Sequence, residues 1–150
     1  VQLMIMYYII MVSWTDPLPI GIATFGFNSA AYVSEMVRAG ILAVDKGQTE
    51  AGRSLGLSSA STMMLIVLPQ ALKVALPSLL NEFIALLKET AIVGYVGMMD
   101  LTKAGDFIRS RTFSAFFPLI AVALVYLILV TALSRLFARI ERRIRLSDQR

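Results

Sequence analysis

The 150-residue sequence contains no cysteine and no histidine, and only 16% of its residues are charged. The absence of cysteine excludes a disulfide framework. Without cysteine or histidine, the usual zinc ligands and the Ser-His and Cys-His catalytic pairs are also missing. We therefore expect no metal site and no cofactor bound by this chain.

Apolar residues are correspondingly abundant. They make up 57% of the sequence, and the mean hydropathy is +0.74. A soluble domain is about 45–50% apolar and about 25% charged, so the composition indicates a protein that lies largely in lipid and excludes a disordered chain. The net charge of +4 is typical of the cytoplasmic loops of a membrane protein, and we expect no nucleic acid partner.

Four apolar stretches predict an all-α, polytopic bundle of membrane helices. The clearest is an uncharged run of 23 residues from Thr112 to Ser134, which is about 35 Å long as a helix and can cross a hydrocarbon core of about 30 Å. An uncharged run at 1–15 is shorter than the roughly 20 residues of a full span, so we expect the chain to begin inside a transmembrane helix. The predicted spans are residues 1–14 (partial), 18–44, 70–88 and 113–137.

Residues 46–68 are predicted to form a helix–turn–helix loop outside the bilayer. The uncharged stretch at 54–72 begins with small and hydroxylated residues, and Pro69 interrupts its apolar part. This composition favours a polar hairpin that is joined directly to the span at 70–88.

Local structure is predicted at two positions of the loop and at one pair in the span before it. Thr49 is placed to cap a short helix from Glu50 to Leu55. Gly56 follows that helix and is predicted to end it in a left-handed turn. In the preceding span, Glu35 and Arg38 are three residues apart, so they share a helix face and can form an ion pair.

Basic residues near the ends of the spans set the predicted orientation. The tail at 138–150 is expected to be cytoplasmic and attracted to anionic lipid. Counting back span by span places residues 89–113 outside and residues 45–69 inside. The arginines that support this orientation are Arg135, Arg139, Arg142, Arg143, Arg145 and Arg150.

The loop resembles the cytoplasmic signature of bacterial ATP-binding-cassette importer permeases. That signature is Glu-Ala-Ala, three residues, Gly, nine residues and Ile-x-Leu-Pro, and here it reads Glu50-Ala51-Gly52, Gly56 and Ile66-Val67-Leu68-Pro69. Only Gly52 departs from it, standing where the second alanine is expected. A glycine there loosens the helix by about 1 kcal/mol but keeps the position small enough for close packing.

The resemblance extends over roughly residues 10–145 and is to the polar amino acid branch of that family. It rests on Ala31–Arg38, Gly47-Gln48, Leu68–Ala71, Leu87–Thr90 and Glu141-Arg142-Arg143.

The resemblance implies a multi-pass subunit of the bacterial inner membrane with the permease fold of type I importers. It would pair with a second permease subunit, identical or related, and with two ATPase subunits that bind ATP and Mg²⁺. A soluble substrate-binding protein would deliver an amino acid from outside. The sequence has no G-x-x-x-x-G-K-[ST] phosphate-binding loop, so the energy is expected from a partner and the chain is not an enzyme. The residues assigned to ATPase coupling are Glu50, Ala51, Gly52, Leu55, Gly56 and Leu57.

An amino acid carries two opposite charges, so a pathway for it needs an anionic partner and hydrogen-bond donors. Ionisable side chains inside a membrane cost about 2.5–3.5 kcal/mol each and are expected to face protein or water. The candidate pathway residues are Asn81, Glu82, Lys88, Glu89 and Thr90. For the same residues, internal ion pairs or contacts with lipid headgroups remain alternatives.

Three other functions are weighed against an amino acid permease. A structural or channel-forming bundle would need no cytoplasmic docking helix, and a permease for another solute would share most of the features above. An intramembrane protease would need paired aspartates within the spans, and the aspartates here all lie outside them.

Overall fold

A computed structural model describes the backbone of residues 1–147 and the side chains of residues 1–144. All regular secondary structure in this part of the chain is helical, which confirms the predicted all-α fold class. Arg150 of the predicted basic tail and the side chain of Arg145 lie outside the described residues. The elements in chain order are α1 (Gln2–Ile5), the π-helical η1 (Met6–Ile10), α2 (Pro17–Leu42), α3 (Lys46–Ser54), α4 (Ser59–Thr62), the π-helical η2 (Met63–Val67), α5 (Leu68–Glu89), the 3-10 helix η3 (Thr90–Val96), α6 (Leu101–Thr112) and α7 (Phe116–Ser147).

Two helical stretches in the described part are long and apolar enough to cross a membrane. They are Ser59–Val96, with 38 residues, and Phe116–Ile144, with 29 residues. They overlap the predicted spans at 70–88 and 113–137. That the four predicted spans cross a membrane stays a prediction. The tail expected after residue 137 is helical as far as Ser147, because its arginine, leucine and isoleucine residues are compatible with a helix.

Pro69 interrupts the apolar part of the sequence at 54–72, but it does not interrupt the helix. The helix runs from α4 through η2 into α5, and the amide of Leu68 donates to the carbonyl of Met63, five residues back. A proline removes one amide donor and crowds the carbonyl four residues before it. The wider π turn directly before Pro69 makes room for that ring, so the helix continues past it.

The chain divides into two compact units, each described here by itself. The first comprises residues 1–30 and 83–135. Its core is formed by Leu3, Val93 and Val96, with Tyr7, Phe25 and Met98 packed around them.

Two turns shape the last part of the first unit. Gly97 ends η3 with a positive φ of 84°, a conformation that glycine adopts without strain. Asp100 caps α6 by accepting from the amide of Lys103 at 2.7 Å. α6 ends at Phe113, which has a φ of 51° and is 97% exposed.

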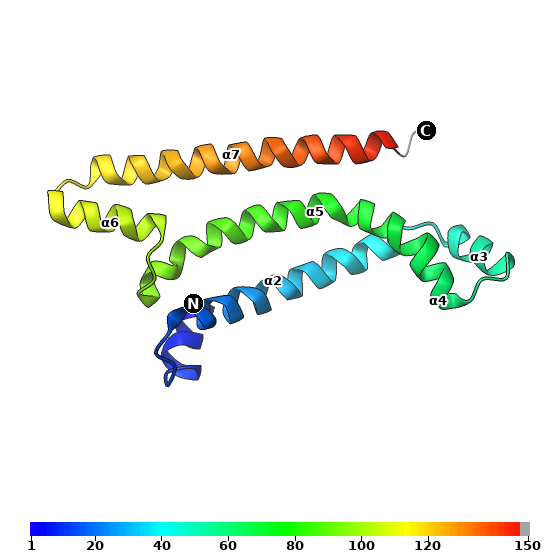
Figure 1. The fold of residues 1–150 in the computed structure, drawn as a ribbon, viewed down its shortest axis with the longest axis horizontal. Coiled ribbons are helices and arrows are strands. Elements are labelled where there is room, and N and C mark those ends of the chain that lie inside the picture. Colours follow the sequence, from blue (N-terminus) through cyan, green and yellow to red (C-terminus); the bar gives the residue numbers. More distant parts are fainter. Residues whose placement is uncertain (148–150) are drawn as a thin grey trace. The chain divides into compact units, whose positions relative to one another are not determined.

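Among the described residues, the second unit comprises 31–82 and 136–147. In it, α2 and α5 approach closely at Gly40, which is buried opposite Ala71 and Ala75. Figure 1 shows α3 and α4 of this unit as the two arms of a hairpin, and α4 leads directly into α5.

Candidate functional site

The hairpin formed by residues 45–67 contains the residues that the sequence assigns to ATPase coupling. Its first arm, α3, begins at Lys46 because Asp45 caps it, with the Asp45 carboxylate accepting from the amide of Gly47 at 2.6 Å. The prediction that Thr49 caps this helix is wrong. Asp45 already provides a cap one turn earlier, so Thr49 and Glu50 lie within α3.

The turn after α3 is closed by two backbone hydrogen bonds. The amide of Leu57 donates to the carbonyl of Gly52 at 3.2 Å, and the amide of Gly56 donates to the carbonyl of Arg53 at 3.0 Å. This is the Schellman arrangement, in which the residue after the last helical turn takes a left-handed conformation. Gly56 has a φ of 85°, so the predicted left-handed turn is confirmed.

The turn continues directly into the second arm. The side chain of Arg53 donates to the carbonyl of Leu57 at 2.8 Å. Ser58 caps α4, its hydroxyl accepting from the amide of Ser61 at 3.1 Å. With both helix ends capped, the backbone between α3 and α4 is held by hydrogen bonds at each step, which favours a single conformation.

The two arms pack closely at Gly52. Gly52 is buried, and a Cβ atom placed on it would lie 2.7 Å from the Cγ2 of Thr62 and 2.9 Å from the Cδ1 of Ile66. Thr62 is only 1% exposed, and its hydroxyl donates to the carbonyl of Ser58 at 2.9 Å. The smallest residue therefore lies where α3 meets the second arm.

A second contact joins α3 to the first turn of α5. The side-chain amide of Gln70 donates both to the side chain of Gln48, at 3.3 Å, and to the carbonyl of Ile66, at 3.1 Å. Sequence reasoning did not assign a role to Gln48 or Gln70, because 22 positions separate them and only the folded hairpin brings them together.

The outer side of α3 is exposed. Glu50, Ala51 and Arg53 are exposed, as are all residues of α3 except Gly52, and Leu55 is 82% exposed at the end of the hairpin. Leu57 is half-buried. An exposed leucine beside charged side chains, on a fixed backbone, gives a small surface suited to contact with another protein.

The predicted pathway residues fall along α5 and at the start of η3. Asn81 is exposed and Glu82 half-buried in the second unit, while Lys88, Glu89 and Thr90 are exposed in the first. Thr90 donates to the carbonyl of Leu87 at 2.8 Å, which ends the last turn of α5.

Glu89 has a partner on another helix. It accepts a hydrogen bond at 3.3 Å from the side-chain amide of Asn28 in α2. Both residues line a cavity of about 110 Å³, together with Val1, Gln2, Leu3, Thr24, Phe25 and Ile92. The sequence signal that could have identified Asn28 is its amide side chain within the uncharged run that follows Pro17.

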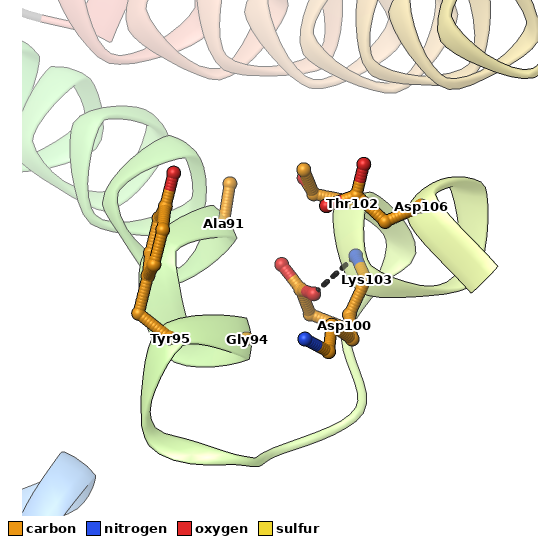
Figure 2. A pocket seen from close by; sticks show the side chains of 7 residues that line it. All are labelled: Ala91, Gly94, Tyr95, Asp100, Thr102, Lys103 and Asp106. Atoms are coloured by element: carbon orange, nitrogen blue, oxygen red, sulfur yellow. Dashed lines mark hydrogen bonds between the residues drawn. The ribbon is translucent and has the colours of Figure 1, made fainter. Parts of the chain in front are cut away.

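A second, smaller cavity of about 50 Å³ lies between η3 and α6. Figure 2 shows Ala91 and Tyr95 on one side and Asp100 and Lys103 on the other, and the lining also includes Gly94, Thr102 and Asp106. The Oδ2 atom of Asp100 is buried and has no hydrogen-bond partner among the described residues.

Ion pairs also form on the exposed faces of α2 and α6. Glu35 and Arg38 approach to 2.6 Å on an exposed face of α2, so the predicted pair is confirmed. Asp106 and Arg109 approach to 3.2 Å on α6. Exposed pairs of this kind contribute little to stability.

Comparison with known proteins gives a family and several close relatives. Residues 1–146 match the family described as binding-protein-dependent transport system inner membrane component. A permease protein of Rickettsia bellii, named for a glutamine transport system, is 44% identical over 148 residues, which are 96% of this chain and 67% of that protein. The arginine transport system permease protein ArtQ of Bacillus subtilis is 38% identical over 150 residues, covering 98% of this chain and 68% of ArtQ.

The fold is also similar to a solved structure. The crystal structure of an amino acid ABC transporter with histidines superposes on this chain with a TM-score of 0.87 and 44% sequence identity. The similarity covers 95% of this chain and 67% of that one.

Proposed function

This chain belongs to the family of binding-protein-dependent transport system inner membrane components, and on that premise we propose that it acts as the permease subunit of an amino acid importer. The observation that carries the proposal is the hairpin at 45–67, a capped polar element that leads without interruption into the apolar helix α5. Relatives named for glutamine and arginine transport support an amino acid as the substrate.

The partners follow from the function. The subunit pairs in the inner membrane with a second permease, and two ATPase subunits bind ATP and Mg²⁺ on the cytoplasmic side. A soluble binding protein delivers the substrate from outside. The permease changes no covalent bond in the substrate, so it contributes a route and a conformational change, not catalysis.

Coupling to the ATPase occurs at the hairpin. Glu50, Ala51 and Leu55 form the exposed contact surface, while Gly52, Gly56 and Leu57 fix the backbone behind it. When ATP binding closes the two ATPase subunits, they displace the hairpin. Because α4 continues through η2 into α5, this displacement reaches the spanning helix and alternates the access of the pathway.

The pathway for the substrate passes the polar residues of α5 and η3. We assign to it Asn81, Glu82, Lys88, Glu89 and Thr90, and we add Asn28, because its amide meets the Glu89 carboxylate at the edge of a cavity. A carboxylate such as that of Glu89 suits the ammonium group of an amino acid, and amide or lysine donors suit its carboxylate.

Cross-linking tests the position of the hairpin. The chain has no native cysteine, so single cysteines can be introduced at Leu55, which is 82% exposed, and at Phe113, which is 97% exposed. In native membranes we expect Leu55→Cys to cross-link to the ATPase subunit and Phe113→Cys, on the predicted outer side, to remain free of it. ATPase cross-linking at Phe113→Cys, or its absence at Leu55→Cys, would overturn both the orientation and the coupling site.

A further inference from the structure

We propose that Gly52 and Thr62, together with Gln48 and Gln70, are positioning residues that join α3 rigidly to the base of α5. The inference rests on the proposed function, because it concerns how displacement of the hairpin reaches the spanning helix. The chain connection between α3 and α4 is a turn at residues 55–58 that backbone hydrogen bonds hold. Side-chain contacts between α3 and the second arm would further oppose a hinge motion about this turn.

The first contact that holds them is steric. Gly52 lies so close to the second arm that an added methyl group would meet the Cγ2 of Thr62 at 2.7 Å. Ile66 also comes near, at 2.9 Å, but through the end of a flexible side chain that can rotate away. Thr62 is β-branched, 1% exposed and fixed by its hydrogen bond to Ser58, so its methyl group cannot yield in the same way.

The second contact is polar and lies one turn closer to the membrane helix. The amide of Gln70 bridges Gln48 of α3 and the carbonyl of Ile66 in η2. Gln70 lies directly before Ala71, whose carbonyl faces Gly40 of α2 where the two helices are in close contact in the second unit. A movement of α3 therefore reaches α5 at Gln70, next to the point where α5 contacts α2.

These contacts also account for the departure from the family signature. The second alanine of the signature corresponds to Gly52, and here Thr62 occupies the space that an alanine methyl group would need. We infer that the residues at positions 52 and 62 are matched in size, so that a small residue at one position accompanies a larger residue at the other.

Compensating substitutions test this match. The variants are made in the transporter assembled with its ATPase and binding protein. The coupling ratio is the amount of labelled glutamine or arginine taken up divided by the amount of ATP hydrolysed. We expect Gly52→Ala to lower this coupling ratio about tenfold while ATP hydrolysis continues, since the usual cost of overpacking corresponds to about a tenfold change in an equilibrium constant. Adding Thr62→Ser, which keeps the hydroxyl and removes the methyl group, should restore the ratio. Adding Thr62→Val, which keeps the methyl group, should not.

A surface variant keeps the test independent of folding. Gln48→Met preserves the length of an exposed side chain and removes the hydrogen bond to Gln70, so we expect a smaller fall in the same ratio at unchanged amounts of assembled complex. An unchanged ratio in Gly52→Ala, or equal rescue by Thr62→Ser and Thr62→Val, would overturn the rigid connection and leave the proposed function intact. Failure of the wild-type chain to assemble with any ATPase would overturn both.

Discussion

Gly40 in α2 lies against the backbone of α5, where a Cβ atom on Gly40 would stand 2.6 Å from the carbonyl oxygen of Ala71. Ala75, 3.0 Å from the same position, occupies the next turn. A backbone carbonyl cannot rotate away as a side chain can, so this contact requires glycine. Small residues allow membrane helices to approach in this way, and here the contact lies close to the hairpin that we assign to coupling.

Replacing Gly40 by alanine should separate the two helices. We expect Gly40→Ala to lower the free energy of unfolding by about 1–3 kcal/mol, the usual cost of overpacking, and to reduce uptake. The matched control is Gly26→Ala in the same helix, because a Cβ atom there has no neighbour within 4 Å. Thermal unfolding of the purified complex in detergent compares the two variants, and equal transitions for both would contradict the close approach.

Replacing Gly56 tests the turn of the hairpin by conformation alone. No atom lies within 4 Å of a Cβ placed on Gly56, so only its φ of 85° opposes a side chain. Left-handed backbone costs most residues about 1–2 kcal/mol, whereas asparagine tolerates it. We expect Gly56→Val to block uptake with normal membrane insertion, and Gly56→Asn to retain most of it. Normal uptake by the valine variant would count against a functional role for the turn.

Replacing Asp100 tests the cap of α6. Asp100→Ala removes the acceptor for the amide of Lys103, and loss of such a cap costs about 1 kcal/mol. Asp100→Asn keeps an acceptor and adds a donor at the position of the unpartnered Oδ2 atom, so it should be more stable than the alanine variant. Thermal unfolding of both variants measures the difference, and the reverse order of stability would rule out the capping role.

Substitution of the acidic pathway residues tests their contact with substrate. We expect Glu82→Gln and Glu89→Gln to weaken uptake of amino acids, because each loses a charge that attracts an ammonium group. Glu89→Gln also keeps an acceptor for Asn28, so its packing should persist. Competition between labelled glutamine and other amino acids measures affinity and selectivity. Unchanged kinetics for every amino acid tested would assign these residues to structural contacts.

Local features of the hairpin were predictable where one residue type determines the backbone. The prediction at Gly56 succeeded because a glycine directly after a helix most simply adopts the left-handed conformation. The prediction at Thr49 failed because Asp45, one turn earlier, is an equally good cap, and neighbouring caps compete. Sequence pattern therefore located the hairpin but not the first residue of α3.

Contacts between elements were not predictable from one sequence. The close contact between α2 and α5 in the second unit occurs at Gly40, which the local sequence does not distinguish from the other glycines of α2. Likewise, Asn28 and Glu89 are 61 positions apart. Which of many small or polar residues meet depends on the axial and rotational placement of whole helices, and composition does not contain that information.

The π turn at Met63–Val67 preserves the direction in which the hairpin faces, although it holds an extra residue. An α-helix rotates by about 100° per residue, and this turn accommodates one residue more than a regular helix would over the same rise. Because the π turn absorbs that extra residue, removing one residue there would leave a regular α-helix with nearly the same rotation, and Glu50 and Leu55 would keep their direction. Removing one residue from the regular helix α5 would instead rotate the hairpin around the helix axis by about 100°. The direction in which the contact surface points around the helix axis is thus set by the helical repeat of α5.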